Sequence, residues 1–324
     1  MCEKYNSSAV KCIDSFNKNR SFLMGVSMLA VLLFHAYIAW GGLFVFKYGF
    51  IGVDVFLLLS SYGLCFSYKN STLCTFYKRR IKRVIPYFVS YAIVATILGC
   101  TLGNHCASYW DLFCNITTLS YYNVGGWFID WYLSALVFLY LTFPIFYHLI
   151  NLKTFILLLV GITCFFILYD TTRIQWKHIC LLARVPIFSL GVILYKSFTP
   201  PRSRFMARKT NLLFGSMVLL GSILTVTNLV DATKVSFFFV TSLYCPAFIL
   251  ICWYFKTHLN KRCEYILNFM GDESLLIYLA NILSQLLLDL IYFHNPYRLM
   301  LYILLNFIFI SIIYKLHYKR LKSI

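Results

Sequence analysis

The chain has 324 residues, of which 60% are hydrophobic, 19% are aromatic and only 12% are charged. This composition excludes an ordinary soluble domain, and its long apolar runs are typical of an all-α, polytopic membrane protein. A net charge of +18 could indicate a nucleic-acid partner, but the basic residues cluster beside the apolar runs, where they orient membrane spans. We therefore expect a multi-pass protein of the cell (plasma) membrane that contacts the lipid bilayer and no nucleic acid.

About ten transmembrane helices are expected, in a single integral-membrane domain over residues 1–324. The apolar runs place them at residues 22–40, 49–67, 84–102, 131–150, 154–169, 179–195, 211–229, 235–255, 274–293 and 299–315. With the N-terminus inside, the cytoplasmic segments hold 23 Lys and Arg residues and the opposite loops hold five. The positive-inside rule then places both termini in the cytoplasm.

One ionisable side chain, His35, interrupts the first apolar run. An ionisable group inside a membrane span is costly, so by default it faces the protein interior and marks a functional site. Imidazole is also the side chain best suited to taking and returning a proton near neutral pH. The alternative is a structural role, in which the histidine bridges two helices.

The second run carries Asp54 at a depth that matches His35. His35 lies five residues before the outer end of the first span, and Asp54 lies five residues into the second. At 1.5 Å per residue, both lie about 7–8 Å below the outer boundary, and consecutive spans joined by a short loop are usually neighbours. Asp54 is therefore predicted to hold the tautomer of His35 and stabilise its protonated form. The alternative is a plain interhelical hydrogen bond.

Two arginines, Arg80 and Arg83, lie three residues apart on the cytoplasmic approach to the third span. On a helix this spacing places them on one face, and paired guanidinium groups are well suited to binding phosphate. The alternative is an ordinary juxtamembrane basic cluster that fixes orientation or contacts anionic lipid.

Arg184 is a third ionisable residue at the depth of His35 and Asp54, because the sixth span descends from the outside. Three such groups at one depth indicate a site, so these three residues are the candidate catalytic groups. Arg184 could pair with Asp54 or hold a substrate oxygen, and both alternatives stay open.

The other polar features of the chain carry weaker signals. The twelve cysteines show no metal-ligand spacing, so we expect no metal and no disulfide framework. Trp131 and Tyr132, which open the fourth span, are typical of the interfacial aromatic belt. The sequence gives no role to Ser60, Asp130 or Asn281.

Six segments in chain order resemble motifs of the acyltransferase-3 family of integral membrane O-acyltransferases. They run from Met24 to His35, Gly52 to Gly63, Phe76 to Pro86, Trp131 to Pro144, Arg184 to Gly191 and Gly271 to Leu279. Each motif is loose, but six in order along ten spans are specific.

The resemblance implies a function and two roles for residues. Similar proteins transfer an acetyl or another short acyl group from cytoplasmic acyl-CoA, such as acetyl-CoA, to a sugar hydroxyl. The acceptor is often a bacterial surface polysaccharide, or its lipid-linked precursor. By this resemblance His35 is the general base, and Arg80 and Arg83 are the paired arginines of the third span, where we expect the acyl-CoA to bind.

The chain departs from the family pattern at three places. Met24 replaces an arginine that usually lies eleven residues before the histidine, and Arg20 is the candidate substitute. Ser134-Ala135-Leu136 stands where many members carry a glutamate, and Asn281 lies near the position of a frequent histidine. These departures bear on how the acyl donor is bound and on which acceptor is used. They also leave the alternative that the protein is a catalytically impaired, acyltransferase-like scaffold.

A transporter or flippase for a glycan or lipid is the rival class, because buried His, Asp and Arg also line transport paths. The sequence shows neither an inverted repeat nor a pair of Gly- or Pro-broken spans in corresponding halves, which are the usual signs of such proteins.

Reporter fusions test the predicted orientation. A fusion after Ser203 should read as cytoplasmic and a fusion within residues 104–125 as external, because the loop charges are so unequal. The opposite readings would overturn the orientation.

Overall fold

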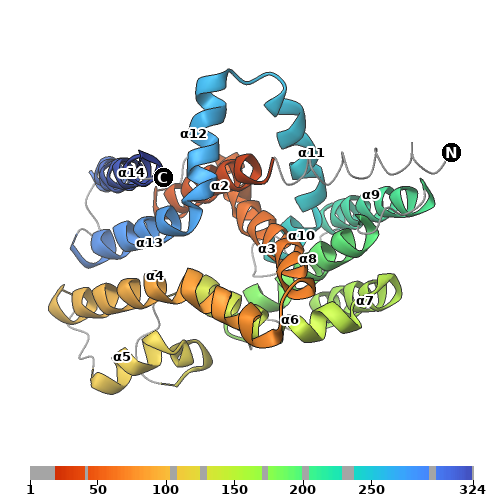
Figure 1. Cartoon of the computed structure of the whole chain (residues 1–324), viewed down its shortest axis with the longest axis horizontal. Helices are drawn as coiled ribbons and strands as arrows, with labels where there is room; N and C mark the ends of the chain where they lie inside the picture. Colours follow the sequence, from red (N-terminus) through yellow and green to blue (C-terminus); the bar gives the residue numbers. More distant parts are fainter. Residues whose placement is uncertain are drawn as a thin grey trace. The chain divides into compact units, whose positions relative to one another are not determined.

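The computed structural model describes residues 19–40, 43–102, 108–124, 130–169, 174–198, 204–227, 237–291 and 297–322. Within these ranges the chain forms helices and no β-strand (Figure 1), which confirms the predicted all-α fold. The chain divides into two compact units that alternate along the sequence. Unit 1 comprises Met1–Val31, Tyr48–Asn70 and Thr142–Asp272, and unit 2 comprises Leu32–Lys47, Ser71–Leu141 and Glu273–Ile324.

Seven helical segments are long and apolar enough to cross a membrane, so the chain is a multi-pass membrane protein. They are Arg20–Ile38, Phe44–Lys69, Leu73–Leu102, Trp131–Leu149, Trp176–Ser197, Ser274–Ile291 and Arg298–Tyr318. An eighth span is possible as a bent pair, Phe237–Leu243 followed by Cys245–Lys256, whose axes differ by 51°. The shorter apolar helices Leu152–Leu168 and Asn211–Val226 coincide with the fifth and seventh predicted spans.

Each of the ten predicted spans therefore coincides with an apolar helix of the structure. The cytoplasmic location of the termini stays a prediction, and Ser203 lies outside the described residues.

Unit 1 is built on the close packing of α3 (Ile51–Lys69) against α8 (Trp176–Phe198). At Gly191 of α8, an added Cβ would lie 1.9 Å from Ser61 Oγ and 2.4 Å from the Leu58 carbonyl oxygen. No side chain fits at these distances, so glycine is required for the two helices to approach. Small residues serve the same purpose at helix interfaces in membranes generally.

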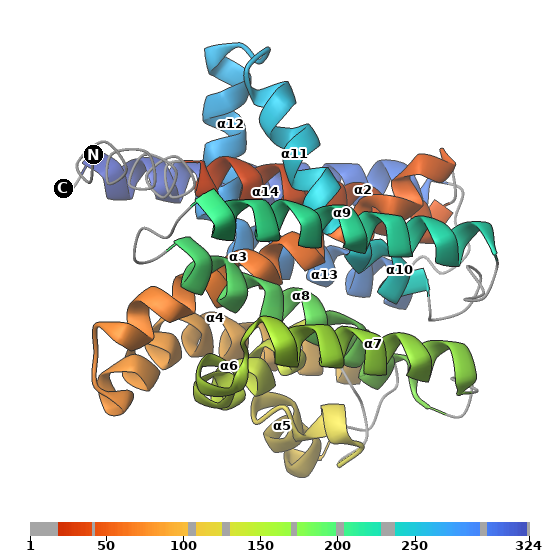
Figure 2. The same cartoon turned by 90° about the vertical axis from the view of Figure 1, so that its right-hand side faces the viewer.

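Three further helices of unit 1 pack on α8: α7 (Leu152–Leu168), α9 (Arg204–Val226) and α10 (Phe237–Leu243). Figure 2 shows α8 between α7 and α9. The buried face of α10 stacks the ring of Phe239 on that of Phe166 in α7, with 4.9 Å between the centroids. These contacts bury α8 along most of its length.

The N-terminal half of α2 (Arg20–Trp40) belongs to unit 1 and packs against α12 (Lys261–Asp272). An added Cβ at Gly25 would lie 1.8 Å from the Leu267 carbonyl oxygen, and one at Gly271 would lie 1.8 Å from that of Ser21. The helix α12 pairs with α11 (Cys245–Lys256) in a helical hairpin (Figures 1 and 2).

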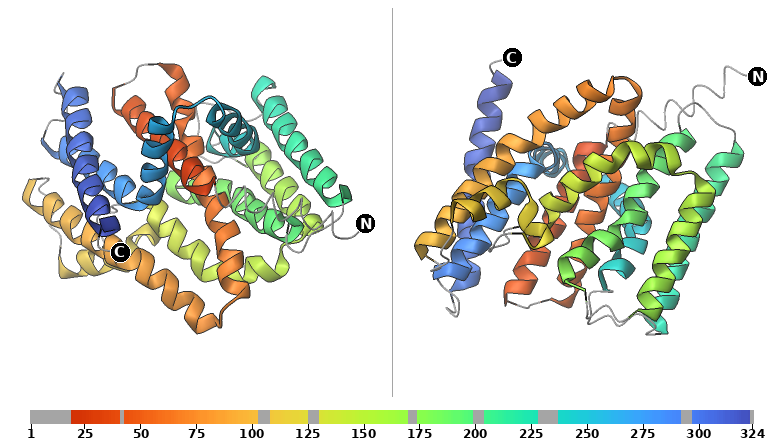
Figure 3. Two further views of the ribbon diagram at one scale, coloured as in Figure 1. Left: turned by 45° about the horizontal axis from the view of Figure 1, so that its top comes forward. Right: turned by 90° about the horizontal axis from the view of Figure 1, so that it is seen from below.

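Unit 2 is centred on α13 (Ser274–Ile291), which contacts both α14 (Arg298–Lys322) and α4 (Leu73–Leu102). Figure 1 shows α13 between these two helices. The helix α4 continues past its internal proline, Pro86, without a break (Figure 3). Unit 2 therefore provides a packed interior between α4, α13 and α14.

The short helix α5 (Tyr109–Ile116) is fixed to α4 by a polar contact. The side-chain amide of Asn115 donates to Thr96 Oγ1 at 3.1 Å. Ser108 and Asp111 form a capping box at the start of α5, which satisfies amide groups that the first helical turn leaves unpaired. A short 3-10 helix, η2 (Leu119–Tyr122), follows it, and the start of α6 (Trp131–Leu149) completes the unit.

Candidate active site

The five predicted site residues divide between the two units. Asp54 and Arg184 belong to unit 1, whereas His35, Arg80 and Arg83 belong to unit 2. Each group is described within its own unit. The predicted contact between His35 and Asp54 would join the two units, and it stays a prediction.

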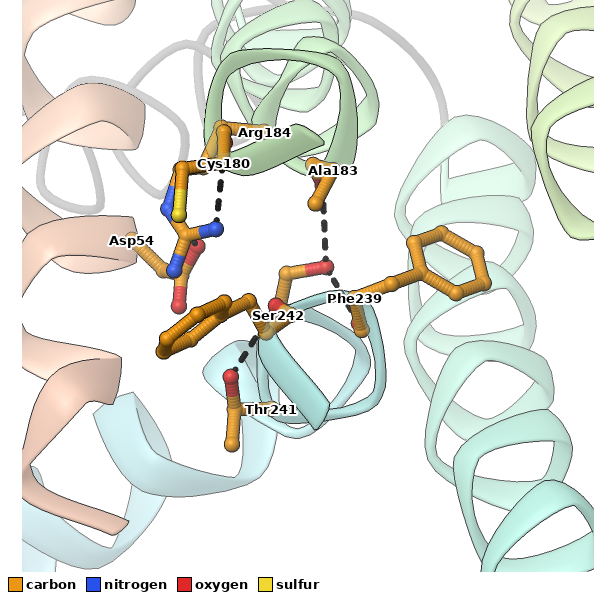
Figure 4. Close-up of polar contacts among 8 residues, drawn as sticks. Asp54, Cys180, Ala183, Arg184, Phe239, Thr241 and Ser242 are labelled. Carbon is orange, nitrogen blue, oxygen red and sulfur yellow. Dashed lines mark hydrogen bonds and ion pairs between the residues drawn. The ribbon is translucent and has the colours of Figure 1, made fainter. Parts of the chain in front are cut away.

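Asp54 and Arg184 form an ion pair in the interior of unit 1. Arg184 Nε lies 3.6 Å from Asp54 Oδ1, and both side chains have no exposed surface. Asp54 is on the first turn of α3 and Arg184 is in the middle of α8. The guanidinium also donates from Nη1 to the carbonyl oxygen of Cys180, one turn earlier, at 3.1 Å (Figure 4). Of the two alternatives for Arg184, the structure shows pairing with Asp54.

Two aromatic rings lie against the Arg184 guanidinium. Its Cζ lies 4.2 Å from the centroid of the Phe50 ring and 5.5 Å from that of Phe238. A cation over a ring face is stabilised by the electrons of the ring, and more strongly where water is excluded. These contacts tie together α3, α8 and α10, so the pair has a clear structural role.

His35 lies on the half of α2 that belongs to unit 2, next to Asn281 of α13. His35 Nδ1 is hydrogen-bonded to the side-chain amide of Asn281, which is fully buried. Tyr302 of α14 lies on the other side of this amide, with its Oη 2.5 Å from Asn281 Oδ1 and 3.2 Å from the Leu32 carbonyl oxygen. Three helices therefore meet in one polar chain, and His35 Nε2 has no hydrogen-bond partner among the described residues.

A second polar cluster lies beside His35 in unit 2. The ring of Tyr278 is 6.5 Å from that of His35, and its hydroxyl donates to Asp130 Oδ1 at 3.1 Å. The same carboxylate oxygen accepts the backbone N–H of Tyr132 at 2.9 Å, at the start of α6. Asp130 is buried, and its Oδ2 has no hydrogen-bond partner among the described residues. Asp130 thus caps α6 and joins it to α13.

Arg80 and Arg83 lie one turn apart on α4, as the spacing predicts. Arg80 is half-buried, with its Cζ 5.9 Å from the centroid of the Phe76 ring, whereas Arg83 is exposed. The neighbouring Lys78 and Lys82 are exposed as well. Arg80 is therefore the more firmly positioned arginine of the pair, and both the phosphate-binding and the orienting role stay open.

This chain has Met24 where the family pattern has an arginine, and the candidate substitute, Arg20, lies in unit 1. The guanidinium of Arg20 lies against Gly63 of α3, where an added Cβ would be 3.5 Å from Nη2. The described residues contain no cluster of His, Cys, Asp or Glu that could hold a metal ion.

Sequence reasoning missed Tyr302 and assigned no role to Asn281 or Asp130. Each is a polar side chain inside, or directly before, an apolar helix, and that was the signal that identified His35 and Asp54. The carboxylate of Glu273, directly before α13, lies 2.7 Å from His317 Nδ1 of α14.

The ion pair of unit 1 gives a prediction about stability. Asp54→Ala leaves the Arg184 charge buried without its carboxylate, so we expect a loss of about 3–5 kcal/mol. The double variant Asp54→Leu with Arg184→Met removes both charges and should recover much of this loss, since apolar replacement of a buried pair is often neutral. Thermal unfolding of the purified protein in detergent measures both.

A wild-type unfolding temperature for Asp54→Ala would contradict a structural role for the pair. Activity of a stable double variant separates the two roles that the sequence left open for Arg184. Retained activity assigns the pair to stability alone, and lost activity assigns it to the chemistry.

Comparison with known proteins places this arrangement in a family. The family profile described as an acyltransferase domain, Acyl_transf_3, matches residues 22–315, which is nearly the whole chain. The match covers both units and all five predicted site residues. Searches of curated proteins and of solved structures found no match. On the family profile, the chain belongs to the acyltransferase-3 family, and it is a multi-pass membrane acyltransferase.

Proposed function

We propose that the protein transfers an acetyl or another short acyl group from cytoplasmic acyl-CoA to a sugar hydroxyl. The proposed acceptor is a surface polysaccharide or its lipid-linked precursor, and the proposed location is the plasma membrane. Acetyl-CoA is the proposed donor, and His35 is the proposed general base.

The environment of His35 supports this proposal. One ring nitrogen, Nδ1, is held by Asn281, while Nε2 has no hydrogen-bond partner among the described residues. A general base needs both features, a fixed ring and a nitrogen that can accept a proton from the substrate. A purely structural histidine that bridges two helices would use both nitrogens, so this arrangement favours the catalytic alternative.

The reaction requires one proton transfer in each direction. His35 takes the proton of the acceptor hydroxyl as its oxygen attacks the carbonyl carbon of the thioester. A new C–O bond forms, the C–S bond breaks, and the thiolate of CoA takes the proton back from the imidazolium. The products are the acyl ester and free CoA. Asp54 and Arg184 are proposed to assist this step, and their structural role in unit 1 is compatible with that.

Arg80 and Arg83 are proposed to bind the phosphates of acyl-CoA. Arg80 is held partly buried against the Phe76 ring. Such a guanidinium loses less freedom when it binds than a fully exposed one does. The exposed Arg83, one turn along α4, adds a second positive charge.

One observation bears on the transporter alternative. The eighth predicted span is a bent pair, α10 and α11, with Pro246 at the start of the second helix. Transporters use broken helices to bind substrates at the middle of the membrane. Transporters built from repeats carry such breaks in corresponding halves, and the described residues contain one such pair. The two functions predict different outcomes for the His35 variant.

Loss of the base should abolish acyl transfer without loss of protein. In a strain whose only copy is His35→Ala, ester-linked acyl groups on the surface glycan should fall by about 10²–10⁴-fold. The exposed His258, changed to Ala, is the matched control and should leave acylation unchanged. Protein level is followed in parallel.

Full acylation in the His35→Ala strain would refute the catalytic assignment. Less glycan at the surface, with normal acylation of what arrives, would support the transporter.

The basic pair gives a prediction about donor binding. Arg80→Ala with Arg83→Ala should raise the apparent KM for acyl-CoA about tenfold or more and leave that for the acceptor unchanged. The reason is that the loss of even one charge-assisted hydrogen bond costs about 1.5–3 kcal/mol, which is about tenfold or more in affinity. Initial rates against donor concentration measure it.

The control is Lys78→Ala with Lys82→Ala, which removes the same charge from the same segment. An equal rise of KM in the control, or no rise in the arginine variant, would assign Arg80 and Arg83 to membrane orientation alone.

A further inference from the structure

Asn281 occupies the centre of a polar chain that runs through three helices of unit 2. It separates the His35 ring on α2 from the Tyr302 hydroxyl on α14, and it is itself on α13. Asn281 has no exposed surface, and Tyr302 is nearly buried. Buried polar groups of this kind take their hydrogen bonds from the protein. The directions of these bonds therefore fix the proton positions of the chain.

A side-chain amide can be seated in two orientations, related by a half-turn that exchanges its oxygen and nitrogen. If the nitrogen faces His35, it must donate to Nδ1, because an amide NH₂ cannot accept. The single proton of the neutral ring is then on Nε2. The Tyr302 hydroxyl, with one hydrogen, would face two acceptors, Asn281 Oδ1 and the Leu32 carbonyl oxygen.

The opposite orientation removes this conflict. With the amide oxygen toward His35, that oxygen accepts a hydrogen bond from Nδ1–H. The amide nitrogen then donates to Tyr302 Oη, and Tyr302 donates its hydrogen to the Leu32 carbonyl oxygen at 3.2 Å. This orientation makes three hydrogen bonds along the chain, whereas the other makes two, because the Tyr302 hydroxyl has only one hydrogen to donate. Since a hydrogen bond contributes a net free energy of about 0.5–1.5 kcal/mol, the orientation with three hydrogen bonds is the more stable one.

We propose that Asn281 and Tyr302 are positioning residues that hold neutral His35 with its proton on Nδ1, so that Nε2 is the nitrogen that accepts the substrate proton. The inference rests on the proposed role of His35 as the base. It gives Asn281 the orienting task that the sequence suggested for Asp54. It also gives Tyr302 a task, because without its hydroxyl nothing in this chain distinguishes the two amide orientations.

Nitrogen NMR of the purified protein in detergent tests the tautomer directly. The protein is labelled with ¹⁵N-histidine, and its seven histidines are resolved in long-range ¹H–¹⁵N spectra at a pH where His35 is neutral. The His35 signals are those that disappear in His35→Gln. We expect a protonated Nδ1 and an unprotonated Nε2 in the wild type. A protonated Nε2 would overturn the inference.

Two variants test the positioning residues separately. Tyr302→Phe and Asn281→Leu should each give a mixture of His35 tautomers and lower kcat about five- to tenfold, since the free-energy difference that selects the tautomer is about that of one hydrogen bond. KM for donor and acceptor should stay unchanged. The control is Tyr314→Phe, an exposed tyrosine on the same helix, which should change neither tautomer nor kcat.

An unchanged tautomer in both variants would overturn the positioning role. The NMR spectra do not depend on enzymatic activity, so the test of the tautomer can be read separately from the acylation test of the proposed function. If the expected tautomer is seen but the His35→Ala strain still acylates the glycan, the proposed role of His35 as the base is refuted. The inferred role of Asn281 and Tyr302 in catalysis is then refuted with it.

Discussion

A polar side chain that is buried among apolar helices must find its partner within the protein, because neither lipid nor an apolar interior can supply one. Both units are organised by this constraint. In unit 1 the Arg184 guanidinium is held by Asp54, by the Cys180 carbonyl and by two aromatic rings. In unit 2 the amide of Asn281 lies between His35 and Tyr302. The first cluster is an ion pair whose Asp54 carboxylate accepts no hydrogen bond among the described residues, whereas the second is a chain of hydrogen bonds that uses only one nitrogen of His35 there.

The two clusters therefore hold their helices together in different ways. A fully buried ion pair contributes little net stability, but removing one partner is costly, so such a pair fixes the packing of the helices that carry it. It does so here for α3, α8 and α10, together with the close approach at Gly191. The polar chain of unit 2 is made of uncharged groups joined by directional hydrogen bonds. In the proposed arrangement, the Tyr302 hydroxyl determines the orientation of the Asn281 amide, and the amide determines the tautomer of the His35 ring. In the proposed mechanism, the His35 ring is thereby oriented before the substrate binds.

The sequence predicts the helices well and their contacts less well. Long apolar runs locate the seven spanning helices, the bent pair and the two shorter apolar helices, because a segment that crosses a membrane must be apolar over about 20 residues. Depth also follows from position along a span, and so Asp54 and Arg184 are correctly expected at one level. The rotation of a helix about its own axis, which decides what a side chain faces, does not follow from hydropathy. The structure is therefore needed to show that Arg184 pairs with Asp54. The contact of His35 with Asn281 joins residues 246 positions apart, and no local pattern contains such information.

Label transfer from the donor tests the assignment of acyltransferase chemistry most directly. Inverted membrane vesicles that contain the protein, and expose its cytoplasmic face, are supplied with radiolabelled acetyl-CoA and with the glycan or its lipid-linked precursor. A base-labile, ester-linked label should appear on the glycan as free CoA is released in equal amount, and neither should appear in vesicles that carry His35→Ala. Glycan that crosses the vesicle membrane while acetyl-CoA stays intact would contradict an acyltransferase and would indicate transport instead.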